Sequence, residues 1–416
     1  MLTVPEKYYV YLDQAWPTNL MIVADLDRSF PIDHVADMWT TFCTHRVLTR
    51  MQVSEDLRMI DAGTGAIDYR GCDMDSAHWD GELSRESRTT YGLGHSIRCR
   101  YLRSEDEQRS RLVLIGHHAI IDGRIGAAEM QAFVRSLDGQ PVPQQTRISR
   151  PAAASEQYPW QRDRLAMLSL LQELREEKAL LGAPGPREWP AADLPRHPRF
   201  QQVVIDRDSS AQIVAAGKAH GTGPLSAMAA AWLVASAGEL CGATPTTLQL
   251  NTPVDVAARV DDPDQPSAMA VAVISGRYCV EPRSPWELAV EVAAGIRRAL
   301  DRGEGDLFFH LARIAAIEDL EVGTRTVRNS ISQAPPAVSV TNLGVIDPGS
   351  DPPWVRWICG YQAPTPNHVA FVSGSGYRGQ LVNMVSTDDS RVSPEAAVEI
   401  RTGFRDVLTT MTPASA

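Results

Sequence analysis

A proline-rich connector between about Asp138 and His197 is the feature that most constrains the fold of this chain. Prolines cluster in it at 141–143, 151, 184–190 and 195–198. Because proline lacks a backbone donor and restricts the residue before it, such clusters interrupt helices and strands. We therefore predict two domains, residues 1–184 and 185–416, with the connector (138–198) at their boundary.

Inside the connector, the stretch from Trp160 to Leu181 is rich in Leu, Glu, Arg and Gln. Four of its leucines recur at helical spacing: Leu165, Leu168, Leu171 and Leu174. This spacing predicts one amphipathic helix between the proline clusters.

Both parts of the chain mix helical and strand-like patterns, which predicts an α/β (α+β) fold. In the first part we expect helices at 31–50 and 125–137, and strands at 95–102 and 111–118. In the second part we expect helices at 209–221 and 225–240, and further helices that begin at Ser284 and Ser393. The strands expected there lie at 247–253, 269–280, 337–342, 368–375 and 380–387.

Charge and cysteine usage narrow the class of protein. The 416 residues carry a formal net charge of -11, which argues against a nucleic-acid partner because such proteins usually present a basic face. The six cysteines are widely spaced and form no CxxC pair, which is typical of free thiols in a reducing cytoplasm. The N-terminus has no basic segment followed by an apolar run, and no stretch approaches about 18 uninterrupted apolar residues. We therefore expect a cytoplasmic protein without a transmembrane segment.

The segment with the clearest chemistry is an apolar run from Arg111 that ends in His117 and His118. Neighbouring residues of a strand point to opposite faces, so the two imidazoles are expected to diverge. Asp122 and Gly123 then give a turn signal before a helix. A carboxylate four residues beyond His118 can return near the strand end and hold the loop.

Three interpretations of this segment compete. The two histidines can be structural residues at a strand end. They can be metal ligands together with Asp122, but diverging side chains and the lack of another His or Cys cluster disfavour a metal. One of them can be a general base, which requires a single imidazole with a pKa near neutral and a fixed tautomer.

The pattern HHxxxDG decides between them, because it resembles the signature of the CoA-dependent acyltransferase superfamily. Two further segments are similar to family motifs: Asn251 to Arg259 resembles a "PVD…R" segment, and Thr341 to Gly344 resembles a late "SNLG" strand end. The resemblance covers nearly the whole chain. The plant branch carries a DFGWG motif that is missing here, so the chain is most similar to the bacterial polyketide-associated acyltransferases, the mycocerosyl transferase group, and to the condensation domains of nonribosomal peptide synthetases.

The resemblance implies two chloramphenicol-acetyltransferase-like halves that form a pseudo-dimer around an active-site tunnel. It implies transfer of an acyl group from a thioester, on CoA or on an acyl carrier protein, to a hydroxyl or amine of a natural product or lipid. Because a thioester is already activated, we expect no metal and no permanently bound cofactor. The acyl-CoA or phosphopantetheinyl carrier is then a co-substrate.

The resemblance also assigns roles to residues. His118 is the general base, and Asp122 holds the loop by pairing with a cation, for which Arg259 is the candidate. Gly123 permits a sharp turn or a close approach. His117 is packed and helps to orient the loop. Asn342 either lines the active site or caps the end of its strand.

Two other functions remain open. One is a free-standing condensation enzyme that joins two carrier-bound partners. The other is a catalytically silent carrier-docking module. The expected partners are a small-molecule acceptor and an acyl carrier protein, and the chain is expected to be a monomer.

Overall fold

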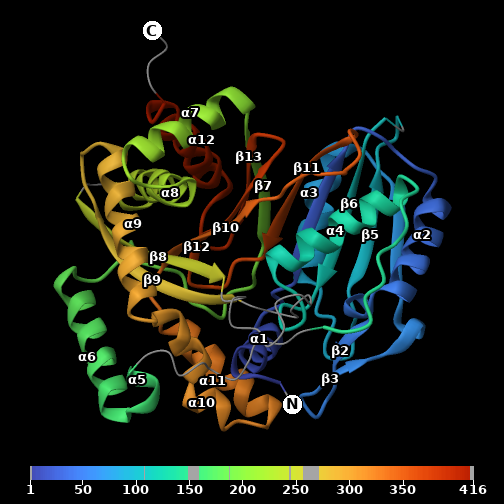
Figure 1. Ribbon diagram of the computed structural model, residues 1–416. Coiled ribbons are helices and arrows are strands. Elements are labelled where there is room, and N and C mark those ends of the chain that lie inside the picture. Colours follow the sequence, from blue (N-terminus) through green and yellow to red (C-terminus); the bar gives the residue numbers. More distant parts are fainter. Residues whose placement is uncertain are drawn as a thin grey trace.

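The computed structural model describes residues 2–106, 108–148, 159–186, 188–242, 245–255 and 271–412. Two β-sheets lie side by side, each with helices packed against it (Figure 1). The mixed α/β class predicted from the pattern is confirmed.

The first sheet has five strands in the order β11-β1-β6-β5-β4. All neighbours in it are antiparallel except β4 and β5. Both faces of β1 and β6 are covered, since every residue of these two strands is buried. The strands are β1 (Leu20–Leu26), β4 (Asp68–Asp73), β5 (Arg98–Arg103), β6 (Ser110–Gly116) and β11 (Val355–Gln362).

Helices α2 and α4 pack on this sheet and bury the aromatic rings of Trp39, Phe42 and Phe133 against one another. The helices of the region are α1 (Val4–Ala15), α2 (Ile32–His45), α3 (Trp79–Arg88) and α4 (Gly123–Leu137). The region also contains the two-stranded sheet β2 (Met51–Val53) and β3 (Met59–Asp61), and the short 3-10 helices η1 (Val47–Arg50), η2 (Gly63–Ala66) and η3 (Ser76–His78).

The second sheet has six strands in the order β7-β13-β12-β10-β8-β9. Strand β10 runs parallel to β8 and β12, whereas the other pairs are antiparallel. The strands are β7 (Pro198–Ile205), β8 (Thr246–Asp255), β9 (Val271–Val280), β10 (Ala337–Val345), β12 (His368–Tyr377) and β13 (Gln380–Asp388).

Helix α8 (Pro224–Cys241) lies in the second core, where most of its residues are buried. Its Trp232 stacks on Phe404 of α12 at 4.1 Å between ring centroids. Within the described residues, α8 alone has the length and apolar composition of a membrane-crossing helix, yet it packs into this core. The helices of the region are α7 (Arg207–Ala219), α8 (Pro224–Cys241), α9 (Pro285–Asp301), η5 (Glu304–His310), α10 (Ala312–Ala315), α11 (Leu320–Ser332) and α12 (Pro394–Thr410).

Strand β11 joins the two halves of the chain. It comes from the predicted second domain, yet it forms the edge of the first sheet, where Cys359 pairs with Val23 of β1. Helix α1 makes the reverse contact, because it packs on α10, α11 and η5 (Figure 1). The two halves on either side of the predicted boundary near residue 185 therefore exchange elements: β11 joins the first sheet, and α1 packs on helices of the second half.

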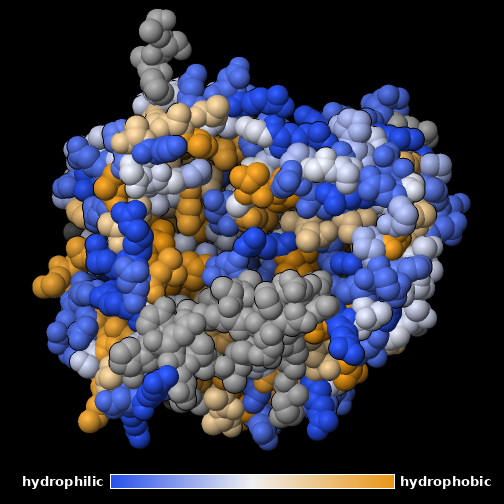
Figure 2. All heavy atoms as spheres, in the orientation of Figure 1, coloured by the Kyte–Doolittle hydropathy of each residue, from blue (hydrophilic) through white to orange (hydrophobic). Residues whose placement is uncertain are grey.

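The connector helix is partly as expected. It divides into α5 (Pro159–Arg162) and α6 (Arg164–Leu180). The leucine stripe does not form a buried face, because Leu165 is 75% exposed and only Leu170 of α6 is buried. Apolar side chains accordingly reach the surface at the edge of the molecule where α6 lies (Figure 2).

Candidate active site

A cavity of about 380 Å³ lies between the two sheets. Its walls come from α1, from the loop after β6, and from β8, β9, β10 and β12. His118, Asp122 and Gly123 line it, and they come from the first half of the chain. Segments far apart in the sequence thus build one chamber, which is the arrangement expected of an active-site tunnel between two halves.

The loop that carries the two histidines begins two residues earlier than the sequence indicated. Strand β6 ends at Gly116, and the amide of Ile120 donates to the carbonyl of His117 at 2.8 Å, which closes a tight turn. Neither histidine lies in the strand, so strand alternation does not orient the two imidazoles. His118 stacks on Tyr9 of α1 and lines the cavity, whereas His117 lies near Asp13 of α1 and is not among the cavity residues.

The imidazole of His118 is held by stacking. Its ring lies on the ring of Tyr9, with 4.1 Å between centroids and an interplanar angle of 19°. Its Nδ1 atom is enclosed by protein, and the residue lines the cavity. Burial lowers the pKa of His118 to about 4, although nearby backbone groups of His118 and Ile121 act in the opposite direction. The ring is therefore neutral near pH 7, although its pKa lies below the near-neutral value expected of a general base.

His117 stabilises the turn. Its Nδ1 accepts a hydrogen bond from the amide of Ala119 at 3.0 Å, which places the proton of the neutral ring on Nε2. That Nε2 lies 3.8 Å from the Oδ2 atom of Asp13, too far for a hydrogen bond. Burial lowers the pKa of His117 as well.

Asp122 is the N-cap of α4. Its buried carboxylate accepts from the amide of Ile125 at 2.9 Å and so satisfies one of the free donors at the helix start. This bond fixes the loop directly after the histidines. The predicted partner of Asp122, Arg259, lies outside the described residues.

Gly123 is needed for close packing. A Cβ atom at this position would lie 2.4 Å from Cδ2 of Leu343. Leu343 belongs to the segment that resembles the late family motif, so the two motif segments touch here. The third segment joins them through an ion pair between Arg124 and Asp255.

Asn342 lies within β10 at a bulge, where the pairing with β12 shifts between Asn342 and Val345. Its Oδ1 accepts from the amide of Gly344 at 2.9 Å, and Gly344 has a φ of +77°, which favours glycine. The adjacent Thr341 and Leu343 line the cavity, whereas Asn342 is not among the lining residues described. Its hydrogen bond to Gly344 therefore holds a bulge three residues before the end of β10.

Substituting Gly123 with alanine is expected to lower kcat/KM by about tenfold or more, because the new methyl group would push Leu343 into the cavity, at an overpacking cost of about 1–3 kcal/mol. The double variant Gly123→Ala/Leu343→Ala removes the obstacle and is expected to recover much of the loss. Steady-state kinetics and thermal unfolding of both variants test this. A double variant no better than the single one would exclude steric conflict with Leu343.

Stability is expected to fall with acidification. Burial lowers the pKa of His118 and of His368, a second histidine in the cavity, to about 4. In the unfolded chain these rings take up a proton below their ordinary pKa of about 6.5, whereas in the folded protein they stay neutral down to about pH 4. Their contribution to the free energy of unfolding is therefore complete above about pH 6.5 and is lost as pH falls from about 6.5 towards 4. For His118 this amounts to on the order of 3 kcal/mol across the window.

Urea unfolding at several pH values between about 7 and 5 measures how the free energy of unfolding changes with pH. The variant His118→Ala/His368→Gln should show a flatter dependence of the free energy of unfolding on pH than the wild type. Equal slopes in the two proteins would show that neither histidine is the source.

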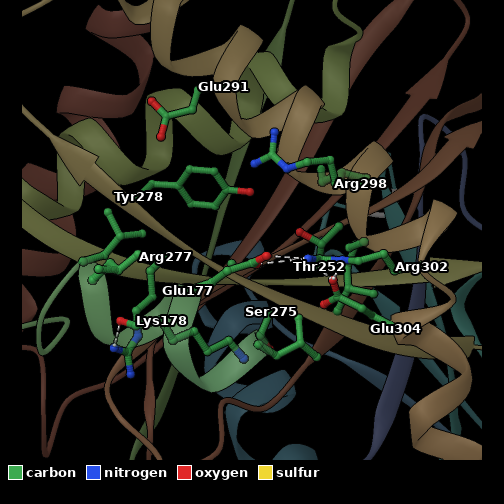
Figure 3. Close-up of a pocket in the computed structure, with 18 residues that line it drawn as sticks. Glu177, Lys178, Thr252, Ser275, Arg277, Tyr278, Glu291, Arg298, Arg302 and Glu304 are labelled. Carbon is green, nitrogen blue, oxygen red and sulfur yellow. Dashed lines mark hydrogen bonds and ion pairs between the residues drawn. The ribbon is translucent and has the colours of Figure 1, made fainter. Parts of the chain in front are cut away.

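A second cavity of about 380 Å³ lies on the other side of β9, between α6 and α9. It contains the ion pair of Glu177 with Arg302, and the ring of Tyr278 points into it (Figure 3). None of the HHxxxDG residues lines it, whereas Thr252 of the second motif segment does. Ser275 lines both cavities, so the two chambers adjoin at this strand. Because only the first cavity holds a neutral imidazole beside the motif loop, we place the candidate active site there.

No cluster of three His, Cys, Asp or Glu side chains within the described residues could hold a metal ion. The aromatic residues of α1 and η5 were not predicted as site residues. Tyr9 supports His118, and Phe308 packs edge-on to both Tyr8 and Tyr9. The tyrosines at 8, 9 and 11 were visible in the sequence, but only the fold brings them to the motif loop.

Residues 194–358 match the family model of the phthiocerol/phthiodiolone dimycocerosyl transferase C-terminus. Among curated protein sequences, none matches this chain significantly.

Solved structures resemble the whole chain. A trichothecene 15-O-acetyltransferase from Fusarium sporotrichioides has a TM-score of 0.73 at 12% identity, covering 99% of this chain and 94% of that one. Polyketide synthase associated protein 5 from Mycobacterium tuberculosis has a TM-score of 0.62 at 16% identity, covering 98% of each chain. The first condensation domain of the calcium-dependent antibiotic synthetase has a TM-score of 0.65 at 16% identity, covering 99% of this chain and 96% of that one.

These likenesses establish the fold, and the family match shows that residues 194–358 are similar to the C-terminal part of the dimycocerosyl transferases. They support an enzyme of the acyltransferase or condensation type. The resemblance inferred from HHxxxDG and the two-part fold it implied are therefore confirmed.

Proposed function

We propose that this protein transfers an acyl group from a thioester, carried by CoA or by an acyl carrier protein, to a hydroxyl or amine of a natural-product or lipid acceptor. The observation that carries the proposal is His118: a neutral imidazole, stacked on Tyr9, that lines a cavity between the two halves. A base of this kind can remove a proton only if it is unprotonated at the working pH.

The proposed reaction needs one base. Nε2 of His118 takes the proton of the acceptor hydroxyl or amine while its oxygen or nitrogen forms a bond to the thioester carbonyl carbon. The tetrahedral intermediate then breaks its carbon–sulfur bond, and the leaving sulfur takes the proton from Nε2. Neither step changes an oxidation state, and His118 returns to its neutral form.

Several features support direct transfer within an enclosed site. The stacked Tyr9 ring and the capped loop at Asp122 fix His118 in place, and preorganisation of this kind is a large part of enzymatic rate enhancement. A cavity of about 380 Å³ matches the size of a small-molecule substrate site. We propose that Arg259 completes the loop by pairing with Asp122.

A free-standing condensation enzyme remains the alternative, because condensation domains are among the similar structures. The two functions differ in the acceptor. A condensation enzyme requires an acceptor bound to a carrier, whereas an acyltransferase accepts a free alcohol or amine. We further propose a monomer in a reducing cytoplasm.

A matrix of donors and acceptors tests the proposal. Acyl-CoAs and acylated carrier proteins are each combined with free alcohols, free amines and carrier-bound amines, and products are followed by mass spectrometry. Acylation of free acceptors supports the acyltransferase. Acylation of carrier-bound acceptors alone would establish the condensation enzyme, and binding of carriers without any transfer would establish a docking module.

A further inference from the structure

One end of the cavity is polar, and its side chains are connected to one another by hydrogen bonds. This polar end consists of Asn251, Ser275, Ser339, Thr365 and His368. They lie on β8, β9 and β10 and at the turn that begins β12. Nothing in the proposed chemistry at His118 uses them.

The hydrogen bonds around His368 have a fixed direction. The amide of Thr365 donates to Nδ1 of His368 at 3.1 Å, so the neutral ring carries its proton on Nε2. The Nε2–H group therefore donates to Oγ of Ser339, 3.0 Å away. The hydroxyl of Thr365 donates to Asn367 at 2.7 Å and does not supply a competing proton.

The direction of these hydrogen bonds determines whether Ser339 can donate or accept. Its oxygen already accepts from His368, so its own proton is left to donate. The same bond excludes His368 as a base for Ser339, because the nitrogen that faces the hydroxyl already carries a proton. Ser339 is thus a hydrogen-bond donor towards the cavity and not an activated nucleophile.

Asn251 is oriented in the same way. Its Oδ1 accepts from Nε2 of Gln249 at 3.2 Å and from Oγ of Ser275 at 2.8 Å. With the amide oxygen occupied twice, the amide nitrogen is the part left to donate. Ser339 and Asn251 are direct partners in the parallel pairing of β10 with β8, so the two donors lie side by side.

The ligand group that fits two such donors is a neutral oxygen acceptor. Within the described part of the chain, no lysine or arginine lines this cavity, so a carboxylate or phosphate would lack a countercharge. A carbonyl oxygen accepts two hydrogen bonds without needing one.

The donors lie away from the reacting atoms. Ser339 precedes Leu343 by four residues on the same strand, which is about 13 Å of extended chain, and Leu343 packs on the motif loop at Gly123. A carbonyl held by Ser339 is therefore a second oxygen of the substrate and not the thioester carbonyl at His118.

We propose that Ser339 and Asn251 form a subsite that binds a remote neutral carbonyl oxygen of the thioester substrate. The subsite rests on the proposed function and refines it, because it selects thioesters with such an oxygen over wholly hydrocarbon ones. The oxygen can belong to an amide of a pantetheine arm or to the acyl chain itself.

Calorimetric binding of unreacted thioesters tests the subsite without any acceptor, so its outcome is independent of whether His118 performs transfer. Three probes form two pairs. S-octanoyl pantetheine and ethyl thiooctanoate differ in the pantetheine arm with its amide carbonyls, and S-(7-oxooctanoyl) pantetheine and S-octanoyl pantetheine differ in one remote ketone of the acyl chain. The wild type should prefer the carbonyl-bearing member of at least one pair by about fivefold. The pair that shows the preference identifies the source of the oxygen.

The variants Ser339→Ala and Asn251→Ala should each remove that preference. Ser339→Thr retains a hydroxyl and should therefore retain the preference for the carbonyl-bearing probe. This variant separates loss of the donor from loss of folding. Thr341→Val removes a different cavity hydroxyl on the same strand and should keep it. If the wild type shows no preference in either pair, or if Ser339→Ala weakens binding of all three probes equally, the subsite does not exist.

Discussion

Replacing His118 with alanine is expected to lower kcat for acyl transfer by about 10²–10⁴-fold, the usual contribution of a general base. The fold should persist, because the ring lines a cavity and its loss leaves no buried charge without a partner. Single-turnover kinetics with a thioester and a free alcohol measure the effect, and circular dichroism checks the fold.

His220→Ala is the matched control. His220 also stacks on an aromatic ring, that of Trp286, with 4.9 Å between centroids, but it does not line the cavity. Its replacement removes a similar stacking contact and should leave transfer close to the wild-type rate. Transfer by His118→Ala at that same rate would exclude His118 as the base.

The variant Arg391→Ala is expected to reduce the free energy of unfolding by about 3–5 kcal/mol, the usual cost of breaking a buried ion pair. The side chains of Arg391 and Asp388 are both fully enclosed and form an ion pair. Arg391 also donates to the carbonyl of Ala191 at 2.8 Å, and Asp388 accepts from the amide of His197 at 2.9 Å. The pair therefore fastens the end of the connector to β13.

Chemical unfolding measures this loss, with Arg199→Ala as the control. Arg199 pairs with Asp389, next to Asp388, but both of these side chains are partly exposed, at 38% and 27%. Removal of an exposed pair costs at most about 1 kcal/mol. Equal destabilisation by the two variants would show that burial of the Asp388 pair has no special effect.

Local pattern predicted much of the fold, because most elements have a periodicity set by burial. The alanine-rich stretch formed the central helix α8, and Ser284 and Ser393 cap the helices that begin there. The leucine stripe of α6 was misleading, because spacing predicts an apolar face but not whether another element covers it.

The candidate site was harder to predict because its parts meet only through long-range contacts. The motif located His118, Asp122 and Gly123, but nothing local places Tyr9 under His118 or Leu343 against Gly123. Strand alternation does not explain the orientations of His117 and His118, because strand β6 ends one residue before them. The residues of β11 likewise do not indicate that this strand pairs with β1 of the first sheet.

The stoichiometry of acyl transfer tests the central claim most directly. Purified protein is incubated with a thioester and a free acceptor, and both released thiol and acylated acceptor are quantified by mass spectrometry. The proposed reaction predicts one acylated acceptor for each thiol released, with little release when the acceptor is omitted. Thiol release that is independent of the acceptor, with no acylated product, would contradict it and identify a hydrolase.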